Sequence, residues 1–228
     1  ASRSTQAIRR LAPDRPDAEL LAWIARLSRY HESELSAKEA GLPRSEWTVI
    51  EREPDEKGRL RDVKRERRIA TRELSLLKAD AEARRTELPR PAASEPRATE
   101  VIGVPLPQPG YHVVEVESKL LGDALLATRA PMYVRTGVLV TNLGVHFKRG
   151  RSTSLVWVTS LDRGRPVAGA RVAVNDCRGQ PIWSGTTDAA GLARVDRGFD
   201  DDLVEGEKCT STQGLFVTAR TADDLGWV

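Results

Sequence analysis

Short apolar runs separated by turn residues fill the chain from Val134 to Arg220, and they constrain its fold more than any other feature. Each run is rich in β-branched or aromatic residues and is followed by Gly, Pro, Asp or Asn, which is typical of strands joined by tight turns. Seven such strands in under a hundred residues predict an immunoglobulin-like antiparallel sandwich. The expected strands are 134–141, 144–148, 154–162, 170–175, 180–183, 192–195 and 214–220.

One hairpin in this region can be predicted in more detail. Gly169 and Gly191 suit turn positions with positive φ, and Asp188 can accept hydrogen bonds within its own turn. Trp157 and Trp183 lie in apolar strands, so burial in the core is expected for both. The other side chains expected to point inward are those of Val172, Val174, Leu192 and Val195.

The first part of the chain contains a helix candidate and a charged ribbon. Residues 17–40 have apolar residues at three- and four-residue steps, and Asp17 can cap the helix start. Trp47–Glu53 and Arg59–Glu66 flank a turn-rich segment and are expected to pair as two strands. The charges of both signs in this ribbon indicate that it is solvated.

Residues 67–88 leave two alternatives open, a continuous helical seam or a strand at 69–77 followed by a short helix at 80–86. We favour the second, because residues 67–74 carry no good apolar stripe. The proline-rich residues 88–97 predict an extended connector. Further along, 111–118 alternate as a strand with one apolar and one polar face, 120–126 form a turn with a short strand or helical turn, and 223–227 form an exit strand.

Charge and hydropathy exclude several functional classes. The formal net charge is +3 in 228 residues, and acidic residues are interleaved with the basic ones. A nucleic-acid surface has a less diluted basic stripe with stacking aromatics, so we expect no nucleic-acid partner. No apolar run approaches the roughly 20 residues that span a bilayer, and any export signal or anchor is expected outside this chain.

A search for catalytic or metal-binding residues gives none. His31, His112 and His146 are scattered over a helix and two strands and match no nucleophile or metal motif. Asp196 with Asp200–Asp202 lacks the alternating oxygen ligands and turn glycine of a calcium loop, so a solvated loop is expected. The sequence therefore predicts neither an enzyme nor a cofactor.

Five residue strings together resemble the bacterial α2-macroglobulins. They are Gly-Val-Pro-Leu (103–106), Pro-Gly-Tyr-His-Val-Val-Glu-Val-Glu-Ser (109–118), Val-Thr-Asn-Leu-Gly-Val-His-Phe-Lys-Arg-Gly (140–150), Ser-Leu-Val-Trp-Val-Thr (154–159) and Arg-Pro-Val-Ala-Gly-Ala-Arg-Val (165–172). The resemblance covers the chain from about residue 100 to its C-terminus. It implies tandem immunoglobulin-like macroglobulin domains, one at 1–129, which need not be complete and carries the helix and ribbon, and a second at 130–228.

The resemblance also implies a function and a location. Members of this family are periplasmic inhibitors that trap endoproteases after cleavage of a bait region. This chain would be scaffold beside neighbouring macroglobulin domains, and the full-length protein would be held at the inner membrane by an N-terminal lipid anchor. The competing class is an adhesin or carbohydrate-binding sandwich module, which an exposed aromatic platform would favour. An enzyme comes third.

The two cysteines, Cys177 and Cys209, are interpreted through the same resemblance. Both lie in polar, turn-like contexts, and a periplasmic setting favours a disulfide between them over two free thiols. A zinc site would leave coordination incomplete. Cys177 and Gln180 have the spacing of the family's thioester, but Gly179 stands where the thioester motif has Glu. We therefore expect no thioester in this chain.

Overall fold

The computed structural model describes residues 4–31, 33–89, 101–199 and 214–228 and is mainly β, which confirms the predicted fold class. The chain falls into two compact units. Each unit is built from several separate stretches of chain. The predicted domain boundary between residues 129 and 130 stays a prediction. Unit 1 comprises Ala1–Ile8, Leu27–Ile102 and Val114–Thr136, and unit 2 comprises Arg9–Arg26, Gly103–Val113 and Gly137–Val228.

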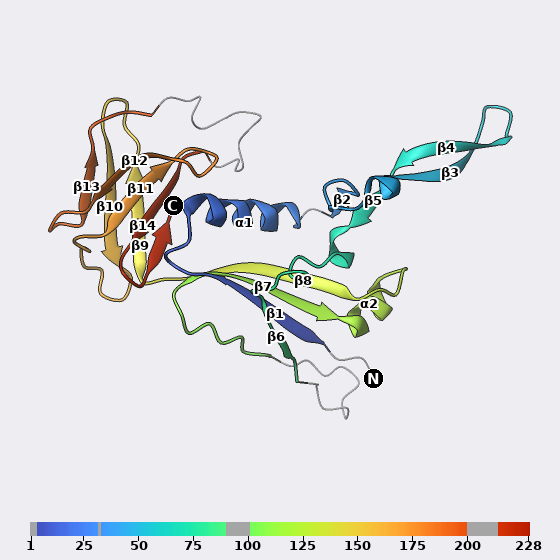
Figure 1. The fold of residues 1–228 in the computed structure, drawn as a ribbon, viewed down its shortest axis with the longest axis horizontal. Coiled ribbons are helices and arrows are strands. Elements are labelled where there is room, and N and C mark those ends of the chain that lie inside the picture. The colour runs from blue at the N-terminus through green and yellow to red at the C-terminus, as the bar shows by residue number, and fades with distance from the viewer. Residues whose placement is uncertain (1–3, 32, 90–100, 200–213) are drawn as a thin grey trace. The chain divides into compact units, whose positions relative to one another are not determined.

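Four strands form a sheet in the order β6-β1-β7-β8 (Figure 1). Its strands are β6 (Arg84–Glu87), β1 (Thr5–Leu11), β7 (Gly110–Ser118) and β8 (Met132–Val140). The strand predicted at 111–118 is confirmed, but its supposed polar face is buried. His112 and Glu115 lie on opposite faces of β7 and are both only 3% exposed, so both faces are covered here.

The short helix predicted for 80–86 is wrong, because residues 84–87 form β6 and pair antiparallel with β1, Ala7 lying opposite Arg85. Backbone pairing with a distant strand here outweighs the helical propensity of the local sequence. Of the strand predicted at 69–77, only β5 (Arg68–Ala70) and a 3₁₀ turn at Thr71–Glu73 form. Most of the predicted connector lies outside the described residues.

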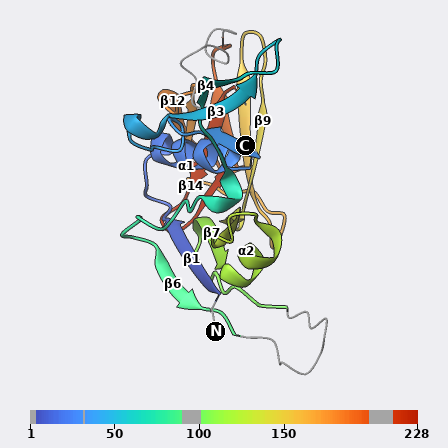
Figure 2. The same ribbon diagram turned by 90° about the vertical axis from the view of Figure 1, so that its right-hand side faces the viewer.

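The predicted charged ribbon is confirmed as β3 (Thr48–Pro54) paired with β4 (Leu60–Glu66). The two strands, labelled in Figures 1 and 2, form a two-stranded sheet of their own. A second small pair joins β2 (Glu34–Ser36) to β5, and a 3₁₀ turn at Arg44–Glu46 precedes the hairpin.

Two helices are present among the described residues. Helix α1 (Asp17–Arg29) begins where predicted but ends eleven residues before the predicted end at 40. Beyond Tyr30 the next large apolar side chain, Leu35, is buried in the β2–β5 pair instead of continuing the helical stripe. Helix α2 (Lys119–Leu125) starts after Ser118, whose hydroxyl accepts a 3.3 Å hydrogen bond from the Leu121 N–H. Neither helix combines the length and apolar character that a membrane crossing requires.

Unit 2 contains a sandwich with sheets in the orders β13-β10-β9 and β12-β11-β14-β15. The strand predicted at 134–141 as its first strand is instead β8, which pairs with β7 in the β6-β1-β7-β8 sheet. Every strand expected from residue 144 onward is present, and the exit strand becomes β15, which pairs with β14. The strands are β9 (Leu143–Lys148), β10 (Ser154–Ser160), β11 (Arg171–Asn175), β12 (Pro181–Thr186), β13 (Leu192–Val195), β14 (Phe216–Arg220) and β15 (Leu225–Trp227).

Aliphatic side chains from both sheets fill the sandwich core. Val172, Val174 and Val195 lie in it as predicted, and Trp183 packs against it partly buried. The predicted burial of Trp157 is wrong, because alternation along β10 places Val156 and Val158 inside and leaves Trp157 42% exposed. Leu192, predicted to point inward, also lies outside the core. It is the direct cross-strand neighbour of Trp157.

Candidate functional site

A buried polar cluster in unit 2 joins the start of α1 to the sandwich, and its members are Asp17, Asn175, Thr218 and Arg220. One carboxylate oxygen of Asp17, Oδ2, accepts hydrogen bonds of 2.9 Å from Asn175 Nδ2 and from Thr218 Oγ1. The other oxygen, Oδ1, pairs with the guanidinium of Arg220. As the first residue of α1, Asp17 also places negative charge where the helix dipole favours it.

Arg220 extends this Asp17 cluster to the chain that precedes the helix. Its Nε donates to the Pro13 carbonyl at 2.8 Å, and its Nη2 donates to the Arg15 carbonyl at 3.1 Å. A planar guanidinium with five donors can hold a carboxylate and two carbonyls at once. The cluster thus fixes both the helix and its entry segment to β14.

The hairpin turn between β11 and β12 packs against the same helix start. Gly179 has φ +78°, and a Cβ there would lie 2.7 Å from the Ala18 Cα, so a larger residue would displace the turn. Burial raises the pKa of the Asp176 carboxyl, but hydrogen bonds from the backbone N–H groups of Gln180 and Arg178 outweigh this, and the pKa is lowered overall.

Cys177 lies in this turn and is 5% exposed. Its predicted partner, Cys209, lies outside the described residues, so the disulfide stays a prediction. Gln180, at thioester spacing from Cys177, closes the β11–β12 turn, where its carbonyl accepts from the Asp176 N–H at 2.9 Å.

An aromatic cluster holds the segment 103–113 to the sandwich. The ring of Tyr111 meets Trp227 edge-on with centroids 5.3 Å apart, and Trp227 lies 6.2 Å from Phe216. Burial raises the pKa of Tyr111 to about 12. Beside it, Arg10 donates two hydrogen bonds to the Pro109 carbonyl, at 3.0 and 2.6 Å. The aromatic contacts thus join segment 103–113 to β14 and β15, and Arg10 of β1 holds the same segment.

Unit 1 has its own buried charge pair, which sequence reasoning missed. Arg135 Nε lies 3.3 Å from Glu115 Oε2, and the two side chains are 4% and 3% exposed. The Glu115 carboxylate also accepts from Ser75 Oγ at 2.5 Å and from the Leu76 N–H at 2.7 Å. In the sequence, Glu115 and Arg135 look like ordinary polar residues of alternating strands. Their role becomes visible only in the structure, where they hold the irregular segment 71–77.

The histidines do not form a site. His31 is exposed, His112 is buried in β7, and His146 stacks on Trp157 with ring centroids 5.4 Å apart. Within the described ranges, no three His, Cys, Asp or Glu side chains lie together as a metal site would require. Asp196 is exposed, and Asp200–Asp202 lie outside the described residues.

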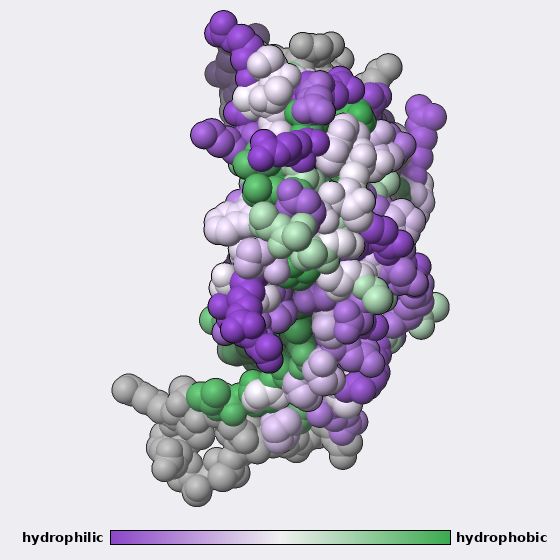
Figure 3. Space-filling view, turned by 90° about the vertical axis from the view of Figure 1, so that its left-hand side faces the viewer, coloured by the Kyte–Doolittle hydropathy of each residue, from purple (hydrophilic) through white to green (hydrophobic). Residues whose placement is uncertain are grey.

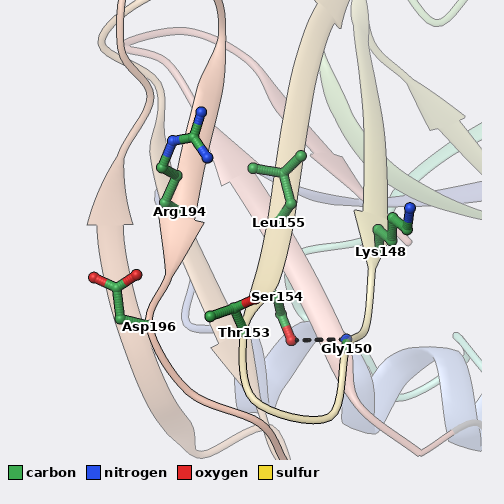
Figure 4. A pocket seen from close by; sticks show the side chains of 7 residues that line it. All are labelled: Lys148, Gly150, Thr153, Ser154, Leu155, Arg194 and Asp196. Atoms are coloured by element: carbon green, nitrogen blue, oxygen red, sulfur yellow. Dashed lines mark hydrogen bonds between the residues drawn. The ribbon is translucent and has the colours of Figure 1, made fainter.

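The outer face of the β9–β10–β13 sheet carries a shallow hollow of about 410 Å³ near one end of β10 (Figure 4). Leu155 lies between Lys148 and Arg194, its direct neighbours on the two flanking strands. Figure 3 views the molecule from the side where β13 lies in Figure 1, and there hydrophobic residues lie among hydrophilic ones. Thr153 and Asp196 line the end of the hollow.

Fold and geometry define the C-terminal part of the chain as an immunoglobulin-like sandwich with structural polar clusters. Residues 140–228 match the family model described as the bacterial alpha-2-macroglobulin MG3 domain. This stretch of the chain is therefore similar to one domain of the bacterial alpha-2-macroglobulins. No match was found among curated proteins.

Solved structures with a related fold cover the whole chain. A crystal structure of native alpha-2-macroglobulin from Escherichia coli spanning domains NIE-MG1 has a TM-score of 0.50 and 16% identity, and the chain covers 82% of it. A crystal structure spanning MG0-NIE-MG1 has a TM-score of 0.47 and 15% identity, with 54% of it covered. A cryo-EM reconstruction of the native conformation of E. coli alpha-2-macroglobulin has a TM-score of 0.39 and 14% sequence identity, and the chain covers 11% of it. At 16% identity the likeness to the first of these structures is one of fold alone.

Proposed function

We propose that this chain is a scaffold part of a bacterial alpha-2-macroglobulin that inhibits proteases by trapping them after bait cleavage. The observation that carries the proposal is the match of residues 140–228 to the MG3 domain of that family. In this role the chain positions neighbouring macroglobulin domains and performs no chemistry of its own. Endoproteases would be the targets of the full-length protein.

The polar cluster at Asp17 supports a scaffold role. In a trap that responds to bait cleavage, a movement of one domain must move its neighbours. This requires connections between elements that do not unfold locally. Buried ion pairs with several additional hydrogen bonds have defined geometry, because each remaining donor and acceptor must also be satisfied. Asp17 and Arg220 meet this condition with partners on β11, on β14 and in the segment before α1.

Trapping can be tested by comparing two substrates. The full-length protein that contains this chain is incubated with an endoprotease, and hydrolysis of casein and of a small chromogenic peptide is followed. We expect casein to be protected while the small peptide is still cleaved, since a trapped protease keeps its active site. The isolated 228-residue chain should neither protect casein from the protease nor hydrolyse either substrate itself. Proteolytic activity of this chain, or unprotected casein with the full-length protein, would contradict the proposal.

We also propose a periplasmic location, with the full-length protein attached to the inner membrane by a lipid anchor outside this chain. The family match supports this location, and the predicted Cys177–Cys209 disulfide is compatible with it. Osmotic-shock fractionation, with radiolabelled fatty acid to detect the anchor, tests both points. Recovery of the unlabelled protein in the cytosol would refute them.

A further inference from the structure

The outer face of the β9–β10–β13 sheet has two parallel rows of side chains that take no part in the polar and aromatic clusters described above. One row, the basic row, consists of Lys148, Leu155 and Arg194, which are direct cross-strand neighbours. The other, the aromatic row, consists of His146, Trp157 and Leu192, which are also direct neighbours. All six side chains point away from the core, because their strand neighbours in sequence, such as Val156 and Val195, fill it.

The basic row places two cations on either side of an apolar side chain. Lys148 and Arg194 are exposed, and neither forms an ion pair with any residue that the structure describes. Leu155 between them is half-buried. Since two strand spacings separate β9 from β13, the backbones that carry the cations lie about 10 Å apart. Two long, mobile basic side chains at this separation can reach the same carboxylate from opposite sides.

The aromatic row has a fixed orientation. Trp157 Nε1 donates to the Ala190 carbonyl at 3.2 Å, and the His146 ring stacks on the indole at an interplanar angle of 34°. The indole N–H and part of one ring face are thus already engaged, which leaves less of the ring for stacking on a sugar. Trp157 is still 42% exposed and has the partly buried Leu192 as its cross-strand neighbour, so the row offers apolar surface to an aliphatic side chain.

The spacing of the two rows fits an extended peptide. Residues two apart in a strand, such as Leu155 and Trp157, are about 6.6 Å apart, and alternate side chains of an extended ligand have the same spacing. A ligand lying along β10 would place residue i over the basic row and residue i+2 over the aromatic row. Asp196, at the end of the hollow beyond Lys148 and Arg194, would then lie near residue i−2.

We propose that this face binds an extended peptide segment of a partner protein with an acidic residue at i and an aliphatic residue at i+2. A basic or hydroxyl-bearing residue at i−2 would meet Asp196 and fix the direction of the segment. The surface differs from a carbohydrate platform in its paired cations and its partly occupied indole. Charge complementarity selects an acidic occupant, and the spacing of the two rows along β10 selects an extended peptide.

The probe is a fluorescein-labelled peptide Gly-Lys-Thr-Glu-Thr-Leu-Gly, titrated with the complete 228-residue chain and followed by fluorescence anisotropy at 50 and 300 mM NaCl. We expect saturable binding that weakens at the higher salt, because exposed charges are screened. Replacing Glu of the peptide by Gln should weaken binding about tenfold, as expected for loss of a charge-assisted hydrogen bond. Equal binding of both peptides, or none up to 5 mM protein, would overturn the proposal.

A charge swap provides a matched test in the protein. The double variant Lys148→Glu with Arg194→Glu should lose the Glu peptide and bind a peptide with Lys in its place. Arg171→Glu alters an exposed cation on β11 of the opposite sheet and should leave binding unchanged, and Trp157→Ala should weaken it several-fold. Unfolding curves establish that each variant is folded. Undiminished binding by the double variant, or tighter binding of an acidic oligosaccharide such as oligogalacturonate, would refute a peptide site here.

Discussion

Glu115 and Arg135 form an ion pair in the interior of unit 1, and both partners also hold the backbone of one irregular segment. Glu115 accepts from the N–H groups of Leu76 and Leu77, at 2.7 and 3.2 Å. Arg135 donates to the carbonyls of Thr71 and Leu74, at 3.0 and 2.7 Å. Residues 71–77 have few regular backbone partners, so these two side chains take the place of a strand or helix.

Replacing Arg135 by Met should lower the free energy of unfolding by about 3–5 kcal/mol, because Glu115 would remain buried without its counter-charge. Burial lowers the pKa of Arg135, although Glu115 opposes this effect. The measurement is urea unfolding followed by circular dichroism. The control is Arg68→Ala, which breaks the exposed pair with Glu34 and should cost about 1 kcal/mol or less. Equal effects of both substitutions would show that the buried pair has no special role.

A double variant refines this prediction. Where a buried pair has no other partners, replacing both charges by apolar residues is often neutral or stabilising. Here Glu115→Leu with Arg135→Met would also leave several backbone N–H and carbonyl groups of residues 71–77 unsatisfied. We therefore expect the double variant to stay destabilised, and full recovery of stability would contradict the backbone role.

Thiol titration tests the predicted disulfide. In 6 M guanidinium chloride without reductant, we expect no thiol to react with Ellman's reagent, and two after reduction. A bridge between Cys177 and Cys209 would close a loop of about 30 residues, and its reduction should destabilise the sandwich by roughly 3–4 kcal/mol. Two reactive thiols in protein prepared under oxidising conditions would disprove the pairing.

The sequence predicted the sandwich well and individual side-chain orientations less well, for a physical reason. Strand positions follow from turn residues and apolar runs, and these were correct throughout β9–β15. In the run from Leu155 to Val158, however, both faces of the strand are apolar, so alternation cannot tell which face lies inside. The core is closed by Val156 and Val158, and Trp157 is left outside with His146.

The elements that were predicted wrongly depend on contacts between residues far apart in the sequence. Residues 84–87 have local helical propensity, yet they extend a sheet by pairing with β1. The Asp17 cluster shows the same limit, since the sequence identified Asp17 only as a helix cap. Its partners Thr218 and Arg220 come from the far end of the chain and carry no local sign of this role.

His112 should make stability depend on pH. Its pKa is lowered, chiefly because burial disfavours the charged form, and Arg10 adds to this against the Gln108 hydrogen bond. Nε2 lies 2.9 Å from the Gln108 carbonyl, which can only accept, so protonation would charge the buried Nδ1, which has no partner among the described residues. With the folded pKa below the unfolded value, stability is complete above pH 6.5 and is lost as pH falls through the folded pKa.

NMR titration of the three histidine Cε1–H signals measures this shift directly. We expect the His112 signal to titrate below the ordinary histidine pKa of about 6.5. In unfolding experiments between pH 7 and pH 5, His112→Gln should flatten the pH dependence, whereas His31→Gln, at an exposed position, should not. Titration of His112 at or above 6.5 would contradict the burial argument.

Arg220→Ala should release the start of α1 from the sandwich. Loss of the guanidinium removes the counter-charge of the largely buried Asp17 carboxylate, which keeps its hydrogen bonds from Asn175 and Thr218, and it removes one hydrogen bond from each of the Pro13 and Arg15 carbonyls. We expect destabilisation of about 3 kcal/mol and faster amide exchange at residues 17–21, measured by hydrogen–deuterium exchange. Arg171→Ala is the matched control, because Arg171 lies directly opposite Arg220 in the β11–β14 register but is exposed. If both variants exchange alike at the helix start, Arg220 does not fasten α1, and the scaffold role would lose its structural support.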